Sequence, residues 1–570
     1  MFRCIKTALA DATPLLTLSL AFAVNSVAHA SDLPRGGEIG AGTHRFAAQR
    51  IAGGDFVRLS DGLEATTIVI TGQNGLVIDG GNFSTAVPLD YTHGIELARG
   101  KNISLYNKEK PIQSPDGSGV VFNLYTAAEI TEIFAGGDQA RIRHAFTSAD
   151  ANHVPPEGLT EAAALAALQA ANAIADARRR TAWQLTSESG DLVVNGGTFN
   201  FQSVNKNIIA AEAGKLIWNG GKLAASGGGG DTVLHGATGI DILGGSIMSS
   251  GTFDGAPAAV QYDARQRLNR DRWTLGKYLS FVTGGDINVG RAGQRTGPVI
   301  HMSDGMLMIG AAPAARGTGT PPVTHHFNIN SGSVTLEGDN RSTLLALAPN
   351  FDLVTVINGG ALNIVNSEHL TRTPTESPSM WNMKTVLERG TINLTNGQII
   401  GPDSAVHGGV VNMTGRSSFN SPAGSLTISG GTINVGENSF VGAIRGDSKA
   451  QSPYPTVQQN LTITGGTLNF KVSAPTDGHR LNVGTNIGGI YAGDNDKTKA
   501  SHASLTLASA TVINLDTSAL QKGEYSVVDF ISVDVGDGSL QIEGPISLGG
   551  PNLPYTGTLD TNGLLIFVVH

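Results

Sequence analysis

Apolar residues alternate with polar residues on both sides of a glycine pair, and this block recurs along the chain. Residues 426–435 and 461–470 both read apolar-x-apolar-x-Gly-Gly-x-apolar-x-apolar. An alternation of period two is typical of a strand with one buried face, and glycine permits a tight bend that residues with a Cβ atom resist. Each block therefore predicts a strand, a corner and a second strand.

The spacing of the blocks predicts how they are arranged. Copies begin at Leu192, Leu216 and Ile240, which are 24 residues apart. Hairpins are the alternative, because Asn-Gly before an apolar run is a hairpin signal and occurs at Asn195-Gly196. A fixed long period fits one coil per repeat stacked on the last, whereas a meander needs no such period. The sequence therefore predicts an all-β solenoid, a parallel β-helix. Further copies surround Gly284-Gly285, Gly359-Gly360 and Asn396-Gly397, and a degenerate first copy covers 76–83.

The residue before the glycines is often an amide or a hydroxyl residue. Stacked coils place such residues above one another, so we expect a side-chain ladder along the corner. Amides and hydroxyls without charged neighbours are better suited to bonding the backbone than to moving protons, which favours a structural role over a catalytic one. The residues in this position are Asn195, Asn219, Thr283, Asn358, Thr395, Ser429 and Thr464.

The first thirty residues predict an export signal that is removed. Arg3 and Lys6 precede an apolar stretch, and Ala28-His29-Ala30 is a small-x-small cleavage site, so we expect the mature chain to begin at Ser31. A transmembrane anchor is the alternative, but the apolar stretch is short for a bilayer span. The only cysteine, Cys4, falls within this segment, so the exported chain is expected to depend on burial and backbone hydrogen bonds without disulfides.

Two other segments interrupt or end the repeat. An Ala- and Leu-rich run follows Thr160 and Glu161 and ends in three arginines, which predicts a capped helix packed on the outside of the solenoid; a partner-binding lever is the alternative. Polar or Pro-rich insertions near 262–278, 313–324 and 371–383 are expected to project as loops from one side. The last stretch loses the glycine pairs and is expected to cap the open end of the stack. The expected organisation is a signal peptide at 1–30, N-terminal coils at 31–140, a helical insertion at 141–185, the main β-helix with loop insertions at 186–519 and a C-terminal cap at 520–570.

The sequence resembles the passenger domains of bacterial autotransporters, the pertactin-like proteins. The resemblance lies in the repeat, the export signal, the cysteine-free mature chain and the closing cap. The resemblance covers most of residues 60–570 and implies a right-handed parallel β-helix at the cell surface or outside the cell, with the periplasm as a further possibility. Segments 75–83 and 94–105 are also similar to coils of pectate-lyase-like carbohydrate enzymes. The sequence departs from the autotransporter pattern because no stretch after the cap is long enough for a translocator barrel.

The binding candidate is the tripeptide Arg445, Gly446 and Asp447, which resembles the integrin-binding motif of some adhesins. The next coil carries Gly493-Asp494 in a matching context, which indicates that Gly-Asp is a turn of the repeat and leaves Arg445 as the distinctive residue.

Signals for metal and acid–base chemistry are weak. His325-His326 has no neighbouring cysteine and lacks metal-site spacing, and residues 227–231 only partly match the calcium-binding Gly-rich repeat. A β-helix lyase or glycosidase needs converging carboxylates, and Asp79, Asp241 and Asp286 fall at different repeat positions. We therefore expect no catalytic residues, metal or cofactor.

The composition of the chain narrows the classes of partner that we expect it to bind. A net charge of -9 argues against nucleic acid, and charged residues make up only 15% of the chain. We expect a monomeric exported scaffold for adhesion or surface association, without a membrane span after signal removal, whose partner is a host or cell-surface protein or a polysaccharide. The alternative is a carbohydrate-active β-helix enzyme, a polysaccharide lyase or glycoside hydrolase.

Overall fold

The structure is a computed structural model of the chain, and every element in its described residues is a β-strand. Among these residues no helix is long and apolar enough to cross a bilayer. The described residues are 31–32, 37–39, 42–52, 57–59, 66–84, 95–98, 102–105, 182–201, 207–226, 232–250, 279–303, 306–311, 323–337, 343–346, 351–366, 368–370, 383–400, 403–415, 417–420, 425–436, 439–441, 459–473, 482–483, 503–527, 530–531, 539–550 and 552–570.

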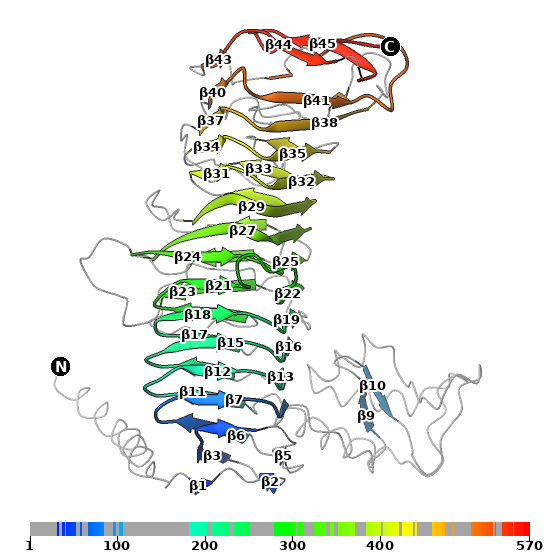
Figure 1. The fold of residues 1–570 in the computed structure, drawn as a ribbon. Helices are drawn as coiled ribbons and strands as arrows, with labels where there is room; N and C mark the ends of the chain where they lie inside the picture. The colour runs from blue at the N-terminus through cyan, green and yellow to red at the C-terminus, as the bar shows by residue number, and fades with distance from the viewer. Residues whose placement is uncertain are drawn as a thin grey trace, which may run out of the picture.

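The strands form a tall stack of coils, and up to β36 the successive coils contribute to three columns (Figure 1). One complete coil runs through β11 (Ala182–Ser187), β12 (Leu192–Val194) and β13 (Thr198–Phe201). Each of these strands pairs in parallel with its counterpart in the coils before and after it. Parallel pairing between successive coils is the arrangement that the repeat predicts, and it excludes hairpins for these blocks.

The three columns have the following members. The first is a 13-stranded sheet made of β1 (Ser31–Asp32), β3 (Gly42–Ala47), β6 (Thr66–Gly72), β11, β14 (Asn207–Ala211), β17 (Thr232–Gly236), β20 (Leu279–Thr283), β23 (Met306–Ala311), β26 (Thr343–Ala346), β28 (Glu368–Leu370), β30 (Gln398–Ile400), β33 (Ser418–Asn420) and β36 (Phe440–Val441). The second contains β4 (Arg50–Ile51), β7 (Leu76–Ile78), β12, β15 (Lys215–Trp218), β18 (Gly239–Ile242), β21 (Ile287–Val289), β24 (Val323–Ile329), β27 (Phe351–Val365), β29 (Met383–Thr395), β31 (Ser404–Val406), β34 (Ser425–Ile428), β37 (Gln459–Ile463), β40 (Ala503–Leu507) and β43 (Leu540–Ile542). The third contains β8 (Asn82–Ser84), β13, β16 (Lys222–Ser226), β19 (Ser246–Ser250), β22 (Val299–Ser303), β25 (Ser333–Glu337), the later parts of β27 and β29, β32 (Val410–Thr414), β35 (Thr432–Val435), β38 (Thr467–Ser473) and β41 (Val512–Asp516).

The observed register confirms the period read from the sequence. Leu192 lies beside Leu216, and Leu216 lies beside Ile240, so residues 24 apart occupy equivalent places in neighbouring coils. The second and third columns are the two strands of the glycine block. Because β27 and β29 run through both of them, these two columns belong to one 25-stranded sheet.

The first column is a third side of the coil that the glycine block did not predict. Its strands bury large side chains, among them Trp183, Ile209 and Phe281, each with none of its surface exposed. These residues lie one strand before the glycine block, in segments whose spacing to the block varies with the connecting turns. A coil with three apolar sides closes a core that two strands alone leave open.

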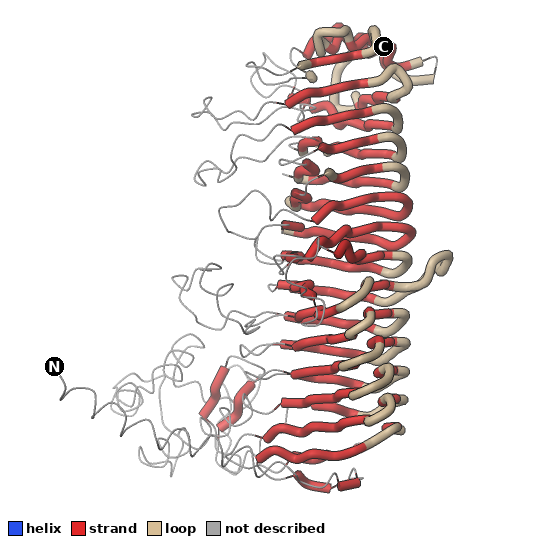
Figure 2. Tube along the Cα trace, turned by 90° about the vertical axis from the view of Figure 1, so that its left-hand side faces the viewer, coloured by secondary structure: helices blue, strands red, loops and turns tan. Residues whose placement is uncertain are grey.

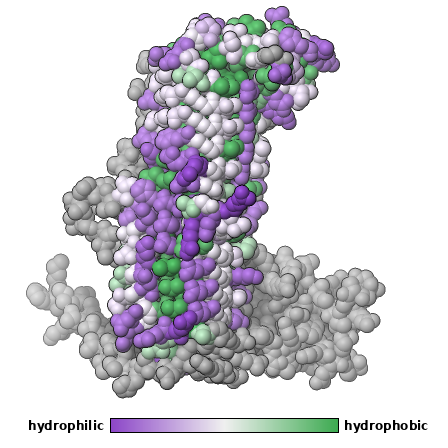
Figure 3. Space-filling model, viewed as in Figure 1, coloured by the Kyte–Doolittle hydropathy of each residue, from purple (hydrophilic) through white to green (hydrophobic). Residues whose placement is uncertain are grey.

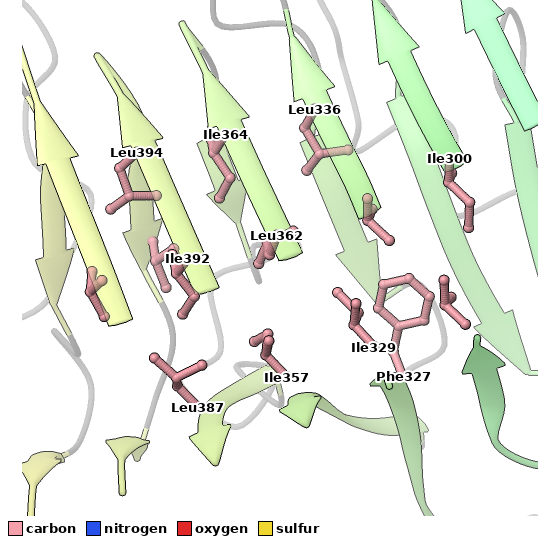
Figure 4. Close-up of a cluster of buried hydrophobic side chains, with 14 of the residues drawn as sticks. Ile300, Phe327, Ile329, Leu336, Ile357, Leu362, Ile364, Leu387, Ile392 and Leu394 are labelled. Atoms are coloured by element: carbon pink, nitrogen blue, oxygen red, sulfur yellow. The ribbon is translucent and has the colours of Figure 1, made fainter. Parts of the chain in front are cut away.

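Inward-facing residues of all three columns form one continuous core. Figure 4 shows part of it, where Phe327, Ile329 and Leu336 from two strands of one coil lie beside Ile357 and Leu362 of the next coil. Each coil thus covers the apolar surface of its neighbour, so the coils stabilise one another and a single coil has no closed interior.

The glycine corners are required by backbone geometry and by close approach. Gly221 has a φ of +98°, and a Cβ atom there would lie 3.0 Å from the carbonyl oxygen of Gly197 in the preceding coil. L-residues rarely adopt this conformation, and the stacked corner leaves no room for a side chain. The glycine pair therefore reflects both the bend and the stacking of successive bends.

The C-terminal end of the stack differs from the coils. A four-stranded antiparallel sheet contains β42 (Gly523–Val527), β44 (Ile546–Gly549), β45 (Tyr555–Leu559) and β46 (Leu565–Val569), and lies at this end in Figure 1. The Leu515 backbone N–H donates to the Tyr555 hydroxyl at 2.7 Å, which joins the sheet to the last coil.

Several expectations fall on other parts of the chain. Residues 1–30, the helix expected after Thr160 and the insertion expected near 262–278 lie outside the described residues, as do most residues of the insertions expected near 313–324 and 371–383. The structure begins β24 at Val323 and β29 at Met383, inside the last two ranges. The first strand after the expected helix, β11, begins at Ala182, inside the range 141–185 assigned to the insertion. Segment 94–105, compared above with a coil, contains an antiparallel pair, β9 (Ile95–Ala98) with β10 (Asn102–Leu105).

Three short strands complete the fold. They are β2 (Gly37–Ile39), which pairs with β5 (Val57–Leu59), and β39 (Asn482–Val483), which pairs with β38.

The stacked core predicts that substitutions at two neighbouring positions of one strand change the free energy of unfolding by very different amounts. Leu426 has none of its surface exposed and faces the core from β34. We expect Leu426→Ala to lower the free energy of unfolding by about 2–5 kcal/mol, because it removes buried methyl groups and leaves a cavity. We expect Thr427→Ala, at the outward neighbour, to change it by about 0.5 kcal/mol or less. Urea denaturation followed by circular dichroism measures both; equal effects would contradict the inward and outward assignment.

Candidate functional site

The tripeptide expected to bind a partner, Arg445, Gly446 and Asp447, lies outside the described residues, as does Gly493-Asp494. The described residues instead place most polar chemistry on the outward faces of the second and third columns and at the corner between them. Three groups stand out there, a row of amides, a corner row and a cluster of charged side chains.

A ladder of asparagines runs up the outward face of the third column. Within it, Asn434 donates through Nδ2 to Oδ1 of Asn412 at 2.7 Å and accepts from Nδ2 of Asn469 at 2.6 Å. The same bond, at 2.6–3.0 Å, joins each member to the one in the preceding coil, and the first amide donates to a threonine hydroxyl. The amide ladder consists of Thr335, Asn363, Asn393, Asn412, Asn434, Asn469 and Asn514.

The amide ladder was not predicted, although its signal is in the sequence. Each of its asparagines lies between two buried apolar residues, as in Ile433-Asn434-Val435, and all but Asn514 follow a glycine corner. Alternation puts that residue outside, and stacking puts it above its counterpart. Because each amide uses one N–H and one oxygen lone pair within the ladder, a second N–H and further acceptor capacity remain on each side chain.

The ladder expected at the glycine corner exists in part. Asn219 donates to Asn195 at 2.9 Å, and Asn195 donates to Asp79 at 2.8 Å. Arg50 also forms an ion pair with Asp79. The hydrogen bond from Asn195, followed by the contacts with Arg50, holds the pKa of Asp79 below its usual range.

Two residues assigned to this corner belong elsewhere. Thr283 ends β20, in the first column, and Thr395 ends β29, before the turn into the first column. Glycine follows a strand at more than one corner of the coil, so the dipeptide alone does not identify which corner it forms. Asn358 does lie at the expected corner, where it accepts from Arg389 of the next coil at 2.9 Å.

A charged cluster lies on the outward face of the second column, over β15, β18 and β24. Lys215 Nζ lies 3.0 Å from Asp241 Oδ2, and Asn288 Nδ2 donates to the other oxygen of Asp241 at 2.7 Å. One coil further, Asp286 Oδ1 accepts from the backbone N–H of His326 at 2.8 Å and lies 3.2 Å from its Nδ1. Figure 3 shows hydrophilic side chains over this part of the stack.

The cluster shows where the three aspartates considered for acid–base chemistry lie. Asp241 lies beside Asn288, two residues from Asp286, so these two carboxylates lie on neighbouring coils of one face. Asp79 follows β7, and β12 and β15 separate its coil from that of Asp241, so it remains apart. Asp286 is level with Gly239 and not with Asp241, so the two carboxylates do occupy different repeat positions, as expected.

Most described contacts between a carboxylate and a basic side chain join different coils. His301 Nε2 lies 2.9 Å from Glu337, and His407 Nδ1 lies 2.9 Å from Glu388, in both cases across one coil boundary. Carboxylates held by a neighbouring coil contribute to stacking and have fewer free oxygens for a substrate. No group of three or more His, Cys, Asp or Glu residues suited to a metal ion occurs in the described parts of the chain.

His325 differs from His326 because its side chain is buried, with 5% of its surface exposed. Burial lowers its pKa below the usual value, against the opposing charge of Asp286, and the charge of His326 adds to the lowering. Neither histidine lies in a metal-binding group within the described residues.

No family model matches the sequence, no curated protein matches it significantly, and no solved structure is significantly similar. The fold therefore defines the class of protein, which is an all-β solenoid of stacked parallel strands.

Breaking the amide ladder in its middle should cost more than breaking it at its end. Asn434→Ala removes two hydrogen bonds, whereas Asn514→Ala removes one. At about 0.5–1.5 kcal/mol for each bond, we expect losses of about 1–3 and about 0.5–1.5 kcal/mol in unfolding free energy. Urea denaturation of the two variants provides the comparison, and a larger loss for Asn514→Ala would show that the ladder does not couple the coils.

The buried His325 predicts a dependence of stability on pH. Because its pKa is lowered in the folded state, the unfolded chain binds more protons between the lowered pKa and about 6.5. Stability therefore falls as the pH drops through this window, and His325 adds no further pH dependence below it. We expect His325→Gln to lose less stability between pH 7 and pH 5 than the unaltered chain. Thr324→Ala, on the same strand, removes no titrating group and should keep the original slope. Identical slopes for His325→Gln and the unaltered chain would contradict this role.

Proposed function

We propose that this protein is an exported scaffold, similar to an autotransporter passenger, that acts in adhesion or cell-surface association. The observation that carries the proposal is that its outward polar groups are bonded from coil to coil. The amide ladder, the corner row and the ion pairs fix the surface of a long stack. A rigid elongated body with a fixed surface is suited to holding binding segments away from the cell.

The finer features of this proposal follow the resemblance to autotransporter passengers. They are the right-handed winding of the coils, the export signal at 1–30, the helix within 141–185 and a capping role for the C-terminal sheet. The unpaired strand edges at the end of a solenoid supply a physical reason for a cap. The proposed binding segment contains Arg445, Gly446 and Asp447, which lie between β36 and β37 in the sequence.

An adhesion assay tests the proposal. Beads coated with the purified chain are passed over cultured host cells and over immobilised cell-surface polysaccharides, and the retained fraction is counted. We expect retention well above that of beads coated with the urea-unfolded chain, because binding needs the folded stack. Retention equal to that of the unfolded coating on every surface would overturn the proposal.

A second candidate function rests on the charged cluster. Asp241 and Asp286 share an outward face with Lys215 and His326, and glycosidases use two carboxylates within about 5–10 Å of each other. A carbohydrate-active enzyme predicts new reducing ends or unsaturated products from one member of a polysaccharide panel. Its turnover should be abolished in Asp241→Asn or Asp286→Asn and retained in Asp79→Asn, whose carboxylate lies on another coil.

A further inference from the structure

One corner of the stack carries a loop where its neighbours carry a tight turn. Nine residues, 290–298, join β21 to β22, and we call them the arginine loop. The same corner takes three residues in the coil before, 243–245, and three in the coil after, 330–332. Figure 2 shows this loop projecting beyond the row of turns along that edge.

The base of the arginine loop is fixed to both neighbouring coils. Gly290 donates its backbone N–H to the Ile242 carbonyl at 2.7 Å, and Ser333 donates to the Pro298 carbonyl at 2.9 Å. Gly290 has a φ of +72°, which turns the chain out of the stack. The loop is thus held at both ends while residues 291–296 are exposed.

The exposed part of the loop carries two cations and no acid. Its sequence is Arg291-Ala-Gly-Gln-Arg295-Thr, and neither guanidinium forms an ion pair or a hydrogen bond with another described residue. The described arginines at other corners are engaged, since Arg50 pairs with Asp79 and Arg389 donates to Asn358. In a chain of net charge -9, two neighbouring arginines whose guanidinium groups have no partner among the described residues concentrate positive charge on this loop.

The chemistry of this site fits anionic oxygens. A guanidinium has five N–H donors in a planar fork that matches carboxylate and sulfate groups. The loop leads into β22, in the third column, and the amide ladder begins in the next coil at Thr335 and continues with Asn363. A polymer that extends from the loop along this face first passes His301, which is paired with Glu337, and then meets the uncharged donors and acceptors of the amide ladder, which suit sugar hydroxyls.

We propose that the arginine loop and the adjoining amide ladder bind an anionic polysaccharide, carboxylated or sulfated, with Arg291 and Arg295 taking the acid groups. This inference rests on the proposed function and names its partner chemistry. Sugar hydroxyls, which the free donors and acceptors of the ladder amides can bond, favour a polysaccharide over a nucleic acid, in which every nucleotide carries a phosphate.

The experiment measures binding of the full chain to immobilised polygalacturonate and heparin, with dextran as the neutral polymer. We expect binding to one anionic polymer that weakens with salt, and no binding to dextran. The double variant Arg291→Ala, Arg295→Ala should bind about tenfold or more weakly, since each arginine supplies charge-assisted hydrogen bonds. Arg389→Ala, an exposed arginine engaged with Asn358, is the matched control and should bind as the unaltered chain does.

The double variant should keep the urea midpoint of the unaltered chain, which separates lost binding from unfolding. No binding to either anionic polymer, or equal loss in the double variant and in Arg389→Ala, would overturn the inference. If beads coated with the double variant still adhere to cells while the unaltered chain binds no anionic polymer, the inference fails and the scaffold proposal stands. If the chain binds polygalacturonate through these arginines but no bead adheres to any surface, the scaffold proposal fails and the anion site stands.

Discussion

Parallel register between successive coils is the constraint on which the whole molecule depends. Because equivalent residues lie side by side at the spacing of neighbouring strands, an apolar position repeated in sequence becomes a column of core, and a polar one becomes a column of surface. Leu192, Leu216 and Ile240 form such a core column, and Asn412, Asn434 and Asn469 form the surface equivalent. The glycine corners follow from the same constraint, since a Cβ atom there would meet the backbone of the coil below.

The sequence predicted those parts of the fold in which the repeat is regular. Alternation around Gly430-Gly431 and the spacing of 24 residues at Leu192 and Leu216 were sufficient for strand positions and parallel stacking. The first column was missed because its strands, such as β11 and β14, have no glycine pair to mark them. Register across the insertions could not be predicted either, and neither could the position of Asp241 and Asp286 on neighbouring coils of one face.

The surface was harder to predict than the core. A corner ladder was expected, and it was observed only in part, at Asn195 and Asn219, whereas the longer row at Asn434 was overlooked. Alternation within one strand is enough to predict which side chains face the core. A hydrogen bond between outward side chains can be predicted only when the residue beside it in the next coil is also known. The arginine loop was overlooked for a similar reason. A connection of nine residues in place of three can be recognised only when the corner to which it belongs is known.

Disulfide trapping tests the register directly. Neighbouring strands lie about 4.8 Å apart, within the Cα separation that a disulfide spans, whereas strands two coils apart are about twice as far. In a Cys4→Ser background, Val193→Cys with Ile217→Cys should form a disulfide in the folded chain, since these residues are paired outward neighbours. Val193→Cys with Asp241→Cys, two coils apart, should remain reduced. Efficient crosslinking of the second pair and none of the first would contradict the stacked parallel coils.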